Sequence, residues 1–279
     1  MKRALFLLAI FIGINSFAQD FNVITFNIRN NNPNNDDGKN AWPLRKELVC
    51  QLLQFHEAAI FGLQEAYDNQ VQYVDSYLKK FEWIGVGRDD GKKAGEFSPI
   101  FYNTEIFKLE KKGWFWLSET PEKPGKGWDA DCVRICTYGK FVQKETGKKL
   151  LVFNTHFDHR GAQARSNSVD LVLQKIEELN EEGLPVLFMG DLNMLPEEAP
   201  IKRLKEKLSD SREVTRELPY GPYGTTSNGF NFLSELKDRI DYIFVNETIN
   251  VLKYAVLSDS ENRHFFSDHL PVFVKVSLK

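Results

Sequence analysis

Cysteine is scarce in this chain of 279 residues, with only Cys50, Cys132 and Cys136 present. A number that is small and odd excludes a fold held together by several disulfide bonds. Cys132 and Cys136 are four positions apart in a strand-like segment, where an extended chain separates them by about 13 Å, beyond disulfide reach. We expect packed free thiols, because a zinc site would need more ligands than the neighbouring sequence offers.

Long apolar runs are also few, and the one that stands out is at the start of the chain. Lys2 and Arg3 precede an apolar stretch over 4–14, which is too short to span a bilayer comfortably. Ser16 and Ala18 supply the small residues that a signal peptidase reads. This order predicts a signal peptide over 1–18 and a domain over 19–279 that is secreted or periplasmic, without a transmembrane segment. The alternative is a buried N-terminal helix.

Basic residues are not in excess, since 36 Lys and Arg stand against 39 Asp and Glu, a formal net charge of −3. Removal of Lys2 and Arg3 with the signal would make the balance more acidic. This disfavours broad, charge-driven binding of nucleic acid, which needs a cationic surface, although a local basic pocket is still allowed. Repeats and low-complexity linkers are lacking as well, which predicts a single domain after the signal.

Short β-rich runs alternate with helical segments along the chain. Pro43 stands at the start of one helix, whose apolar positions Leu44, Leu48, Leu52 and Phe55 predict its buried stripe. A layered architecture is expected, with β-sheet packed on β-sheet and helices outside. The expected strands are 21–28, 59–63, 83–87, 98–102, 114–117, 133–142, 149–156, 185–189, 240–245, 251–257 and 270–276, and the expected helices are 44–55, 71–78, 162–179 and 197–208.

Polar clusters stand at or near the ends of several of these strands. Carboxylates, amides and imidazoles gathered in this way indicate one metal-assisted hydrolytic site, assembled from distant parts of the chain. The clusters are Thr25-Phe26-Asn27, Leu63-Gln64-Glu65, Asn154-Thr155-His156-Phe157-Asp158, Gly190-Asp191-Leu192-Asn193 and Ser267-Asp268-His269-Leu270-Pro271.

These side chains match the needs of phosphodiester hydrolysis. Charge must be neutralised on the phosphate oxygens, a water must be aligned and deprotonated, and the leaving oxygen must be stabilised. Mg²⁺ suits this chemistry because it prefers oxygen ligands. His156 and His269 can reach useful protonation states near neutral pH, and Asp241 is a candidate to hold one ring. The candidate oxygen donors are Asn27, Glu65, Asp191, Asn193 and Asp268.

Each of these residues also has a structural interpretation. Asn27 could be a turn residue, Glu65 a solvated carboxylate, and Asp191 the cap of the helix that starts near 197. Asp241 could pair with Arg239, and the two histidines could be satisfied core residues. All of these interpretations holding together is much less plausible than one shared site.

The motifs resemble those of the endonuclease/exonuclease/phosphatase superfamily. They occur in the order of that superfamily and cover residues 20 to 279. The resemblance implies a four-layered α/β sandwich with two mixed β-sheets packed face to face and helices outside. The matching segments are Thr25-Phe26-Asn27-Ile28-Arg29, Gly62-Leu63-Gln64-Glu65, Gly95-Glu96-Phe97-Ser98-Pro99-Ile100, Asn154-Thr155-His156, Gly190-Asp191-Leu192-Asn193, Arg239-Ile240-Asp241-Tyr242-Ile243 and Ser267-Asp268-His269-Leu270-Pro271.

The resemblance also implies a role for each site residue. Glu65 becomes the principal Mg²⁺ ligand, with Asn27 and Asp268 binding the metal or its water shell. Asp191 orients or deprotonates the attacking water, and Asn193 positions that water or the phosphate. His269, steered by Asp241, contacts the phosphate or acts as base. His156 contacts the phosphate or protonates the leaving group, and Glu96 fixes its ring.

The middle of the chain resembles a narrower, bacterial branch of this superfamily, through Trp116-Leu117-Ser118-Glu119-Thr120-Pro121 and Gly127-Trp128-Asp129-Ala130. Trp114, Trp116 and Trp128 form an apolar platform for a ligand in one interpretation; in the other, the first two pack on one face of a strand. Arg134 either grips a phosphate or pairs with Asp129 or Asp131. Asp158 either lines the pocket or starts a helix.

Taken together, these features predict a Mg²⁺-dependent phosphoester hydrolase, with Mn²⁺ as a plausible substitute. We expect a monomer that acts on a phosphodiester in a small or headgroup-type substrate. One alternative is a secreted nuclease on DNA or RNA. Another is a non-catalytic binding module on the same fold, which is disfavoured because every expected polar position is occupied.

Overall fold

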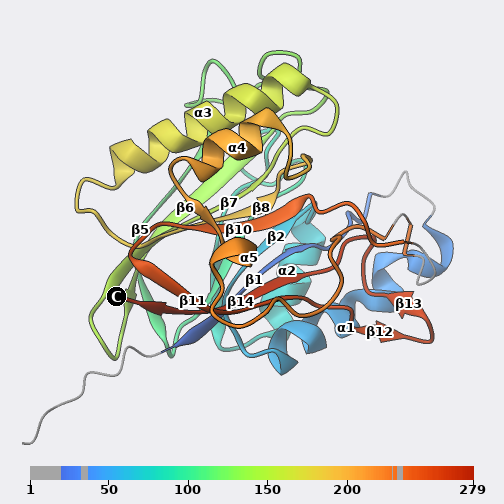
Figure 1. Cartoon of the computed structure of the whole chain (residues 1–279). Coiled ribbons are helices and arrows are strands. Elements are labelled where there is room, and N and C mark those ends of the chain that lie inside the picture. Colours follow the sequence, from blue (N-terminus) through green and yellow to red (C-terminus); the bar gives the residue numbers. More distant parts are fainter. Residues whose placement is uncertain (1–19, 33–36, 228, 231–234) are drawn as a thin grey trace, which may run out of the picture.

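The structure, a computed structural model, describes residues 20–32, 37–227, 229–230 and 235–279 (Figure 1). The predicted signal over 1–18 lies outside these residues, as do positions 33–36 of the stretch 30–40, whose Asn, Asp and Gly residues predict a loop between a strand and a helix. Within the described part of the chain, no helix has the length and apolar character needed to cross a bilayer.

Two six-stranded mixed sheets form the centre of the fold. The strand order of the first sheet is β11 (Ile249–Val256), β14 (Val272–Leu278), β1 (Phe21–Asn27), β2 (Ala58–Gln64), β4 (Ile100–Asn103) and β3 (Phe81–Ile84). The order of the second is β5 (Phe107–Trp116), β6 (Ile135–Gln143), β7 (Lys149–His156), β8 (Val186–Asp191), β10 (Asp241–Val245) and β9 (Ser209–Asp210). A separate short pair joins β12 (Ser260–Glu261) and β13 (His264–Phe265).

Helices cover the outer face of each sheet, which gives four layers (Figure 1). α1 (Trp42–Phe55) and α2 (Asp68–Tyr77) pack on the first sheet, and α3 (Ala162–Leu179) and α4 (Ala199–Lys205) pack on the second. The short helices η1 (Gly38–Asn40) and α5 (Ser211–Val214) lie in connecting segments. The predicted four-layered sandwich of two mixed sheets is therefore confirmed.

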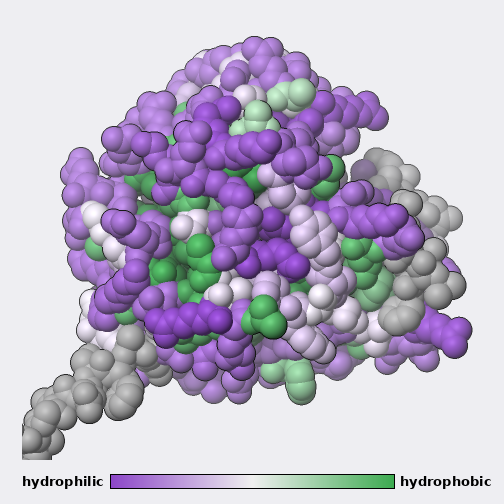
Figure 2. All heavy atoms as spheres, in the orientation of Figure 1, coloured by the Kyte–Doolittle hydropathy of each residue, from purple (hydrophilic) through white to green (hydrophobic). Residues whose placement is uncertain are grey.

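The main core lies between the two sheets, where apolar side chains of both inner faces meet. Its members include Val23, Ile60, Ile100, Val152, Leu187 and Met189. The face of the molecule in Figure 2 is mainly hydrophilic, with hydrophobic side chains visible in the band between α3 and β14. Because the sheets are held by this shared core, side chains at their ends are fixed relative to one another.

Gly62 in β2 allows a polar side chain to cross between the sheets. A Cβ atom at this position would lie 2.5 Å from Asn154 Cγ of β7. The Asn154 amide donates to the carbonyls of Leu63 and Pro99, both at 2.9 Å, and accepts from Gln64 Nε2 at 2.7 Å. This buried amide contact links the two sheets directly beneath the polar strand ends.

The stripe predicted for α1 is only partly right, because Leu52 is buried but both ends of the stripe are exposed. Leu44 and Phe55 are 67% and 79% exposed, and the helix packs instead through Trp42, Val49 and Leu53. The helix carries apolar residues on both sides, and a buried arginine, Arg45, lies on the packed side. A prediction based on the spacing of apolar residues assigns a charged position to the exposed side, so it could not identify the packed face of α1.

The strand predicted over 133–142 begins later than expected, at Ile135. Cys132 therefore lies before the strand that carries Cys136, which corrects the expectation that one strand-like segment holds both cysteines. All three cysteines are free thiols, as predicted. The long helix over 162–179 has the bounds predicted from its sequence.

Candidate active site

The polar strand ends predicted from the sequence come together at one edge of the sandwich. β1 and β2 are parallel neighbours in the first sheet, and β7 and β8 are parallel neighbours in the second. Parallel strands end at the same edge, which places Asn27 and Glu65 opposite His156 and Asp191. The start of β10 and the segment before β14 run antiparallel to β8 and β1 and bring Asp241 and His269 to the same edge.

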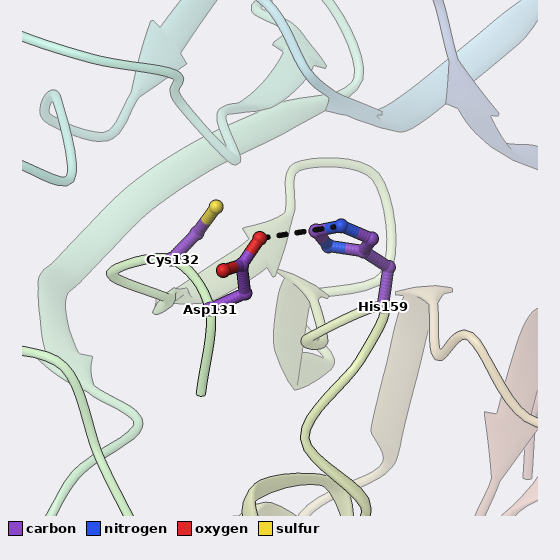
Figure 3. Close-up of side chains that lie close together, drawn as sticks. All are labelled: Asp131, Cys132 and His159. Atoms are coloured by element: carbon purple, nitrogen blue, oxygen red, sulfur yellow. Dashed lines mark ion pairs between the residues drawn. The ribbon is translucent and has the colours of Figure 1, made fainter. Parts of the chain in front are cut away.

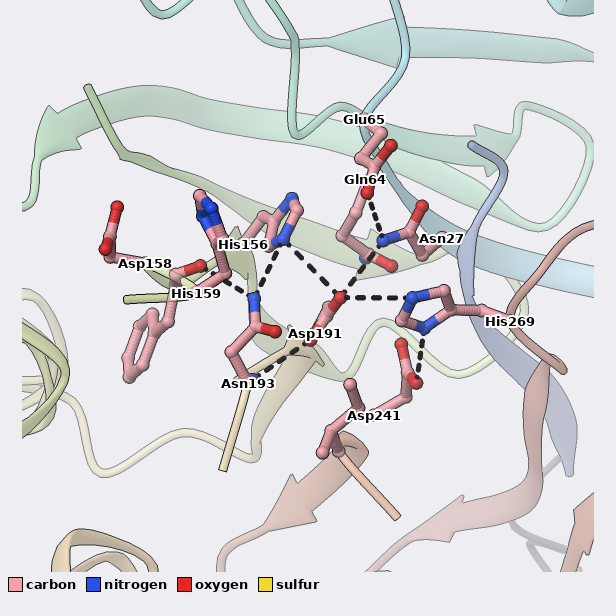
Figure 4. A network of polar contacts seen from close by, with 12 residues as sticks. Asn27, Gln64, Glu65, His156, Asp158, His159, Asp191, Asn193, Asp241 and His269 are labelled. Carbon is pink, nitrogen blue, oxygen red and sulfur yellow. Dashed lines mark hydrogen bonds and ion pairs between the residues drawn. The ribbon is translucent and has the colours of Figure 1, made fainter. Parts of the chain in front are cut away.

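Asp191 lies at the centre of the cluster (Figure 4). Its Oδ2 atom accepts from Asn27 Nδ2 at 3.0 Å and lies 3.4 Å from His156 Nε2 and 3.7 Å from His269 Nε2. Its Oδ1 atom accepts from the backbone N–H of Asn193 at 3.0 Å. Burial, together with the charge of Asp241, raises the pKa of Asp191 above its usual value. A carboxylate in this setting is suited to take a proton from water near neutral pH.

Asp241 holds His269, as predicted. Asp241 Oδ2 lies 2.9 Å from His269 Nδ1, so the other ring nitrogen faces Asp191. Burial alone would lower the pKa of His269, but the charges of Asp241 and Asp191 raise it well above 6.5. These charges favour the imidazolium form of His269, which lies between the two carboxylates. The alternative partner for Asp241 is excluded, because Arg239 pairs with Asp210 at 2.7 Å.

His156 is held from the opposite side. Asn193 Nδ2 donates to the Phe157 carbonyl at 3.0 Å and contacts His156 Nε2 at 3.1 Å. The other ring nitrogen, Nδ1, lies 3.9 Å from Glu96 Oε2. Glu96 is thus beside His156 as predicted, but that distance is too long for a hydrogen bond, and Glu96 instead binds Arg88 at 2.5 Å.

The predicted metal ligands form the first-sheet side of the site. Asn27 Nδ2 donates to Glu65 Oε1 at 3.1 Å, and Ser267 Oγ donates to the Asn27 carbonyl at 2.7 Å and lies 3.2 Å from Asp268 Oδ1. Burial opposes the charge of Glu65, but His269 and the hydrogen bond from Asn27 hold its pKa below 4.5. Glu65, Asn27 and Asp268 therefore offer hard oxygen ligands, two of them carboxylates, which fits a divalent cation such as Mg²⁺.

A second grouping, Asp191, Asp241 and His269, also brings possible ligand atoms within 4.8 Å of one another. We favour the Glu65 side for a cation. Asp241 already holds Nδ1 of His269 at 2.9 Å, and the two carboxylates favour the protonated ring, a form that offers no lone pair to a metal.

Three residues of the site have left-handed backbone conformations, which are rare outside glycine. The φ angles are 57° at Arg29, 62° at Glu65 and 50° at Asn193. Such conformations cost free energy and cluster at functional sites. The carbonyl of Arg29 is held by Arg45 Nη2 and Gln70 Nε2, both at 2.9 Å, which stabilises the turn after β1.

Asp158 supports the site and does not line it. It is 1% exposed and accepts from the backbone N–H groups of Asp131, Cys132, Arg160 and Gly161 at 2.7–3.1 Å. It also forms a buried ion pair with Arg134, at 3.4 Å. The two partners predicted for Arg134, Asp129 and Asp131, are thus wrong. Asp129 instead accepts from the first turn of α3, at Gln163 and Ala164.

Asp158→Asn should lower the free energy of unfolding by about 3–5 kcal/mol at pH 7, because it leaves the buried charge of Arg134 without its partner. Burial opposes the charge of Asp158, but its backbone hydrogen bonds hold its pKa well below the usual 3.8. The stabilisation is therefore present above the unfolded-state pKa and is lost as pH falls through the folded-state pKa. Urea unfolding at pH 7 and at about pH 3 measures both effects. Asp131→Asn, on an exposed side chain, is the control; equal losses in both variants would contradict the assignment.

Asp131, Cys132 and His159 form another group whose ligand atoms lie within 4.8 Å of one another (Figure 3). His159 Nδ1 accepts from Arg134 Nη2 at 3.1 Å, so the hydrogen of the neutral ring is on Nε2, which faces Asp131 at 3.6 Å. Arg160 also lies 3.6 Å from Asp131. A protonated nitrogen and two guanidinium groups disfavour a metal ion here, in agreement with the sequence.

Trp114 and Trp116 follow the structural interpretation, in which they pack on one face of a strand, whereas Trp128 lies outside their apolar cluster. Trp114 and Trp116 pack with Val86 and Ile135, and Trp116 Nε1 donates to the carbonyl of Arg88 at 2.7 Å. These two are structural. Trp128 is partly exposed, with φ of 50°, and its backbone N–H is held by Glu119 at 3.1 Å.

Sequence reasoning missed two residues that build the site, Arg45 and Arg88, and it included Ser267 in a motif without giving it a role. The Arg45 guanidinium contacts the carbonyls of Ile28 and, at 3.2 Å, of Phe266, which joins the segments carrying Asn27 and Asp268. The sequence did contain a signal for Arg45. It lies three positions after Trp42 and four before Val49, a spacing that places all three side chains on one face of the helix. No comparable signal marked Arg88, whereas Ser267 lies in the motif that carries Asp268 and His269.

The model of the endonuclease/exonuclease/phosphatase family matches residues 24–269, a range that contains every site residue from Asn27 to His269. The chain belongs to this family.

Similar solved structures extend the match over nearly the whole chain. A protein of the endonuclease/exonuclease/phosphatase family from Bacteroides thetaiotaomicron is 39% identical, with a TM-score of 0.89 over 94% of this chain and 98% of that chain. A mannosyl-6-phosphatase from Bacteroides thetaiotaomicron VPI-5482 is 38% identical, with a TM-score of 0.88 over 92% of this chain and 100% of that chain. An uncharacterized protein of Acanthamoeba polyphaga mimivirus is 26% identical over 84% of this chain and 91% of its own length.

Proposed function

We propose that this endonuclease/exonuclease/phosphatase family protein is a divalent-metal-dependent phosphoester hydrolase, with Mg²⁺ as its ion and Mn²⁺ as a substitute. The observation that carries the proposal is the position of Asp191, buried between the oxygen ligands around Glu65 and the two imidazoles. A general base, a cation site and two imidazole rings that can contact a phosphate then surround the position where the phosphate would bind.

Glu65, Asn27 and Asp268 would hold the ion. When bound, it would supply Lewis-acid neutralisation of the phosphate charge. The site residues fit a cation because four carboxylates, Glu65, Asp191, Asp241 and Asp268, outnumber the three cations that the described residues place beside them, which are His269, Arg29 and Arg45. Buried carboxylates in such excess need a further positive charge.

The residues of the second sheet would perform the proton transfers. Asp191 accepts a proton from the attacking water, which Asn193 helps to orient. The imidazolium of His269 donates a hydrogen bond to a phosphate oxygen, and Asp241 keeps its ring in place. His156 faces the leaving oxygen from the opposite side of Asp191 and supplies its proton.

The substrate we propose is a small molecule with phosphate on a sugar or a headgroup. The acidic net charge of the chain and the named activity of the mannosyl-6-phosphatase, 38% identical, support a small substrate over polymeric nucleic acid. That relative also supports a sugar phosphate monoester, whereas the requirements considered from the sequence favoured a diester. Export to the periplasm or medium remains part of the proposal, on the strength of the order of residues over 1–18.

Chelation should abolish hydrolysis. With EDTA, the purified protein should lose activity on bis(p-nitrophenyl) phosphate and p-nitrophenyl phosphate, and added Mg²⁺ or Mn²⁺ should restore it, because the carboxylates around Glu65 cannot neutralise a phosphate unaided. Release of p-nitrophenolate measures this directly. Activity that survives exhaustive chelation would reject the metal role.

A panel of hexose phosphates, glycerophosphodiesters, sphingomyelin, plasmid DNA and RNA then ranks the substrates by kcat/KM. Sugar phosphates or headgroup esters should lead. Faster, salt-sensitive cleavage of DNA or RNA would replace the proposal with a nuclease. Metal binding by calorimetry with no hydrolysis of any ester would favour a binding module instead.

A further inference from the structure

Glu96 lies between two partners and binds only one of them. The loop between β3 and β4 places Glu96 Oε2 at 2.5 Å from Arg88 Nη1 and 3.9 Å from His156 Nδ1. His156 Nδ1 is buried and has no hydrogen-bond partner in the structure, and the same holds for Arg88 Nε. An ion pair with Arg88 thus keeps Glu96 about 1 Å short of the ring that it could hold.

The contacts of His156 define its hydrogen. Because Asn193 Nδ2 must donate to the Phe157 carbonyl, it is oriented to donate its second hydrogen to His156 Nε2. Nε2 therefore accepts, and the neutral ring carries its hydrogen on Nδ1. A buried N–H group without an acceptor costs free energy, and Glu96 is the carboxylate beside it.

Charged groups from several elements face this ring. Arg88 and Glu96 come from the loop before β4, Arg134 from the segment before β6, His159 from the turn after β7, Asp191 from β8, and His269 from the segment before β14. Burial, followed by the charges of Arg134 and Arg88, holds the pKa of His156 well below 6.5. With Asn193 Nδ2 donating to Nε2, the ring presents no Nε2 hydrogen to a leaving oxygen.

We propose that Arg88 is a substrate-responsive positioning residue, which binds Glu96 in the free enzyme and releases it to His156 when the substrate phosphate arrives. This rests on the proposed function, because it assigns the proton donor of that reaction. Arg88 can make the exchange, since its side chain is 13% exposed and its Nε makes no hydrogen bond, with only a long contact of 3.9 Å to Asp89 Oδ1. A guanidinium binds phosphate oxygens through a planar fork and would prefer them to a shared carboxylate.

The exchange allows His156 to become protonated and to act as a proton donor. Once Glu96 accepts from Nδ1–H, its negative charge stabilises the imidazolium, which takes up a proton at Nε2. As water oxygen bonds to phosphorus and its proton passes to Asp191, the bond from phosphorus to the leaving oxygen breaks. That oxygen keeps the bonding electron pair and receives the Nε2 proton. The donor is thereby assembled only when phosphate is bound.

Imidazole titration by NMR tests the exchange without relying on turnover. Long-range ¹H–¹⁵N spectra follow the histidine rings, and His156→Asn identifies the signal of His156. Saturating inorganic phosphate should raise the pKa of His156 by about 1 to 3 pH units in the wild type. Arg88→Met should show a similar rise without phosphate, and Arg88→Met combined with Glu96→Gln should not. A His156 titration that is unchanged in Arg88→Met, or a full phosphate effect in Glu96→Gln, would overturn the proposal.

Kinetics separate the two residues further. Arg88→Met should raise KM roughly 10- to 100-fold while kcat stays within about threefold, since phosphate contact is lost but Glu96 already holds His156. Glu96→Gln should lower kcat about 100-fold on an alkyl phosphoester and hardly at all on a p-nitrophenyl ester, whose leaving group needs no proton. Equal losses of kcat on both esters in both variants would indicate a merely structural role.

The controls keep each outcome decisive. Arg160→Met removes an exposed arginine of the same region and should change neither KM nor the titration of His156. Arg88→Lys keeps the charge and should restore most of the wild-type titration if Arg88→Met proves unstable in thermal melts. A wild-type protein inactive on every ester would defeat the proposed function, while the NMR titrations would still decide the contact of Arg88, Glu96 and His156.

Discussion

Glu65→Gln should lower kcat by roughly 10³-fold on any phosphoester that the wild type hydrolyses, a loss of about 4 kcal/mol of transition-state stabilisation. Glu65 is the residue of the first-sheet side whose surroundings hold its carboxylate in the charged form, through His269 and Asn27. An amide keeps the shape and the left-handed backbone but removes the charge that a divalent ion needs. The measurement is kcat at saturating Mg²⁺, with metal affinity from calorimetry.

Glu57→Gln is a matched control for this variant. Glu57 flanks the other end of β2, is exposed, and also has a positive φ angle, of 50°. Its substitution should leave both activity and stability unchanged, and the melting temperature of Glu65→Gln should stay close to that of the wild type. Near-normal turnover in Glu65→Gln would remove this residue from the metal site.

Asp191→Asn should reduce kcat/KM by about 10²- to 10⁴-fold, the range expected when a general base is removed. The amide oxygen can keep one of the two hydrogen bonds, from Asn27 Nδ2 or from the Asn193 N–H, while the amide NH2 cannot accept the other. Initial rates on p-nitrophenyl esters give the size of the effect. Asp170→Asn, on an exposed carboxylate of α3 that pairs with Arg203 at 2.6 Å, should behave as the wild type.

The pH profiles of the wild type and of Asp191→Asn, compared with each other, identify the general base. Burial and the Asp241 charge raise the pKa of Asp191, and a base acts only when deprotonated, so wild-type kcat/KM should fall as pH drops through that pKa. A bound cation moves this limb to lower pH without removing it. The limb should be absent from the residual activity of Asp191→Asn. Its persistence would assign the base to another residue.

The sequence was sufficient for the fold because strand ends and helix bounds carry local signals. α3 was predicted over its observed range, since Gly161 precedes it and its apolar residues recur at helical spacing. The stripe of α1 was only partly right because Arg45 occupies the packed face, and burial of a charge depends on the carbonyls of Ile28, Arg29 and Phe266, which come from distant segments. Such partners leave no trace in local periodicity.

The structure brings the predicted polar strand ends together, yet their contacts were only partly predictable. The pairing of Asp241 with His269 followed from their motifs. The preference of Glu96 for Arg88 over His156 did not, because both candidates were within reach and only the three-dimensional positions decide between them. Arg134 is a similar case, since Asp158 lies 24 residues away from it while the rejected Asp129 and Asp131 are near in sequence.

The contact of Gln64 with Asn154 beneath the site constrains which pairs of sheets can be combined in one protein of this family. One half of the catalytic side chains belongs to each sheet, and their mutual spacing is set where this amide crosses through the space left by Gly62. A chimera that took its first sheet from one relative and its second from another would receive every catalytic side chain but not their alignment. The two halves must therefore evolve as a matched pair, while the surface loops around them are free to diverge toward new substrates.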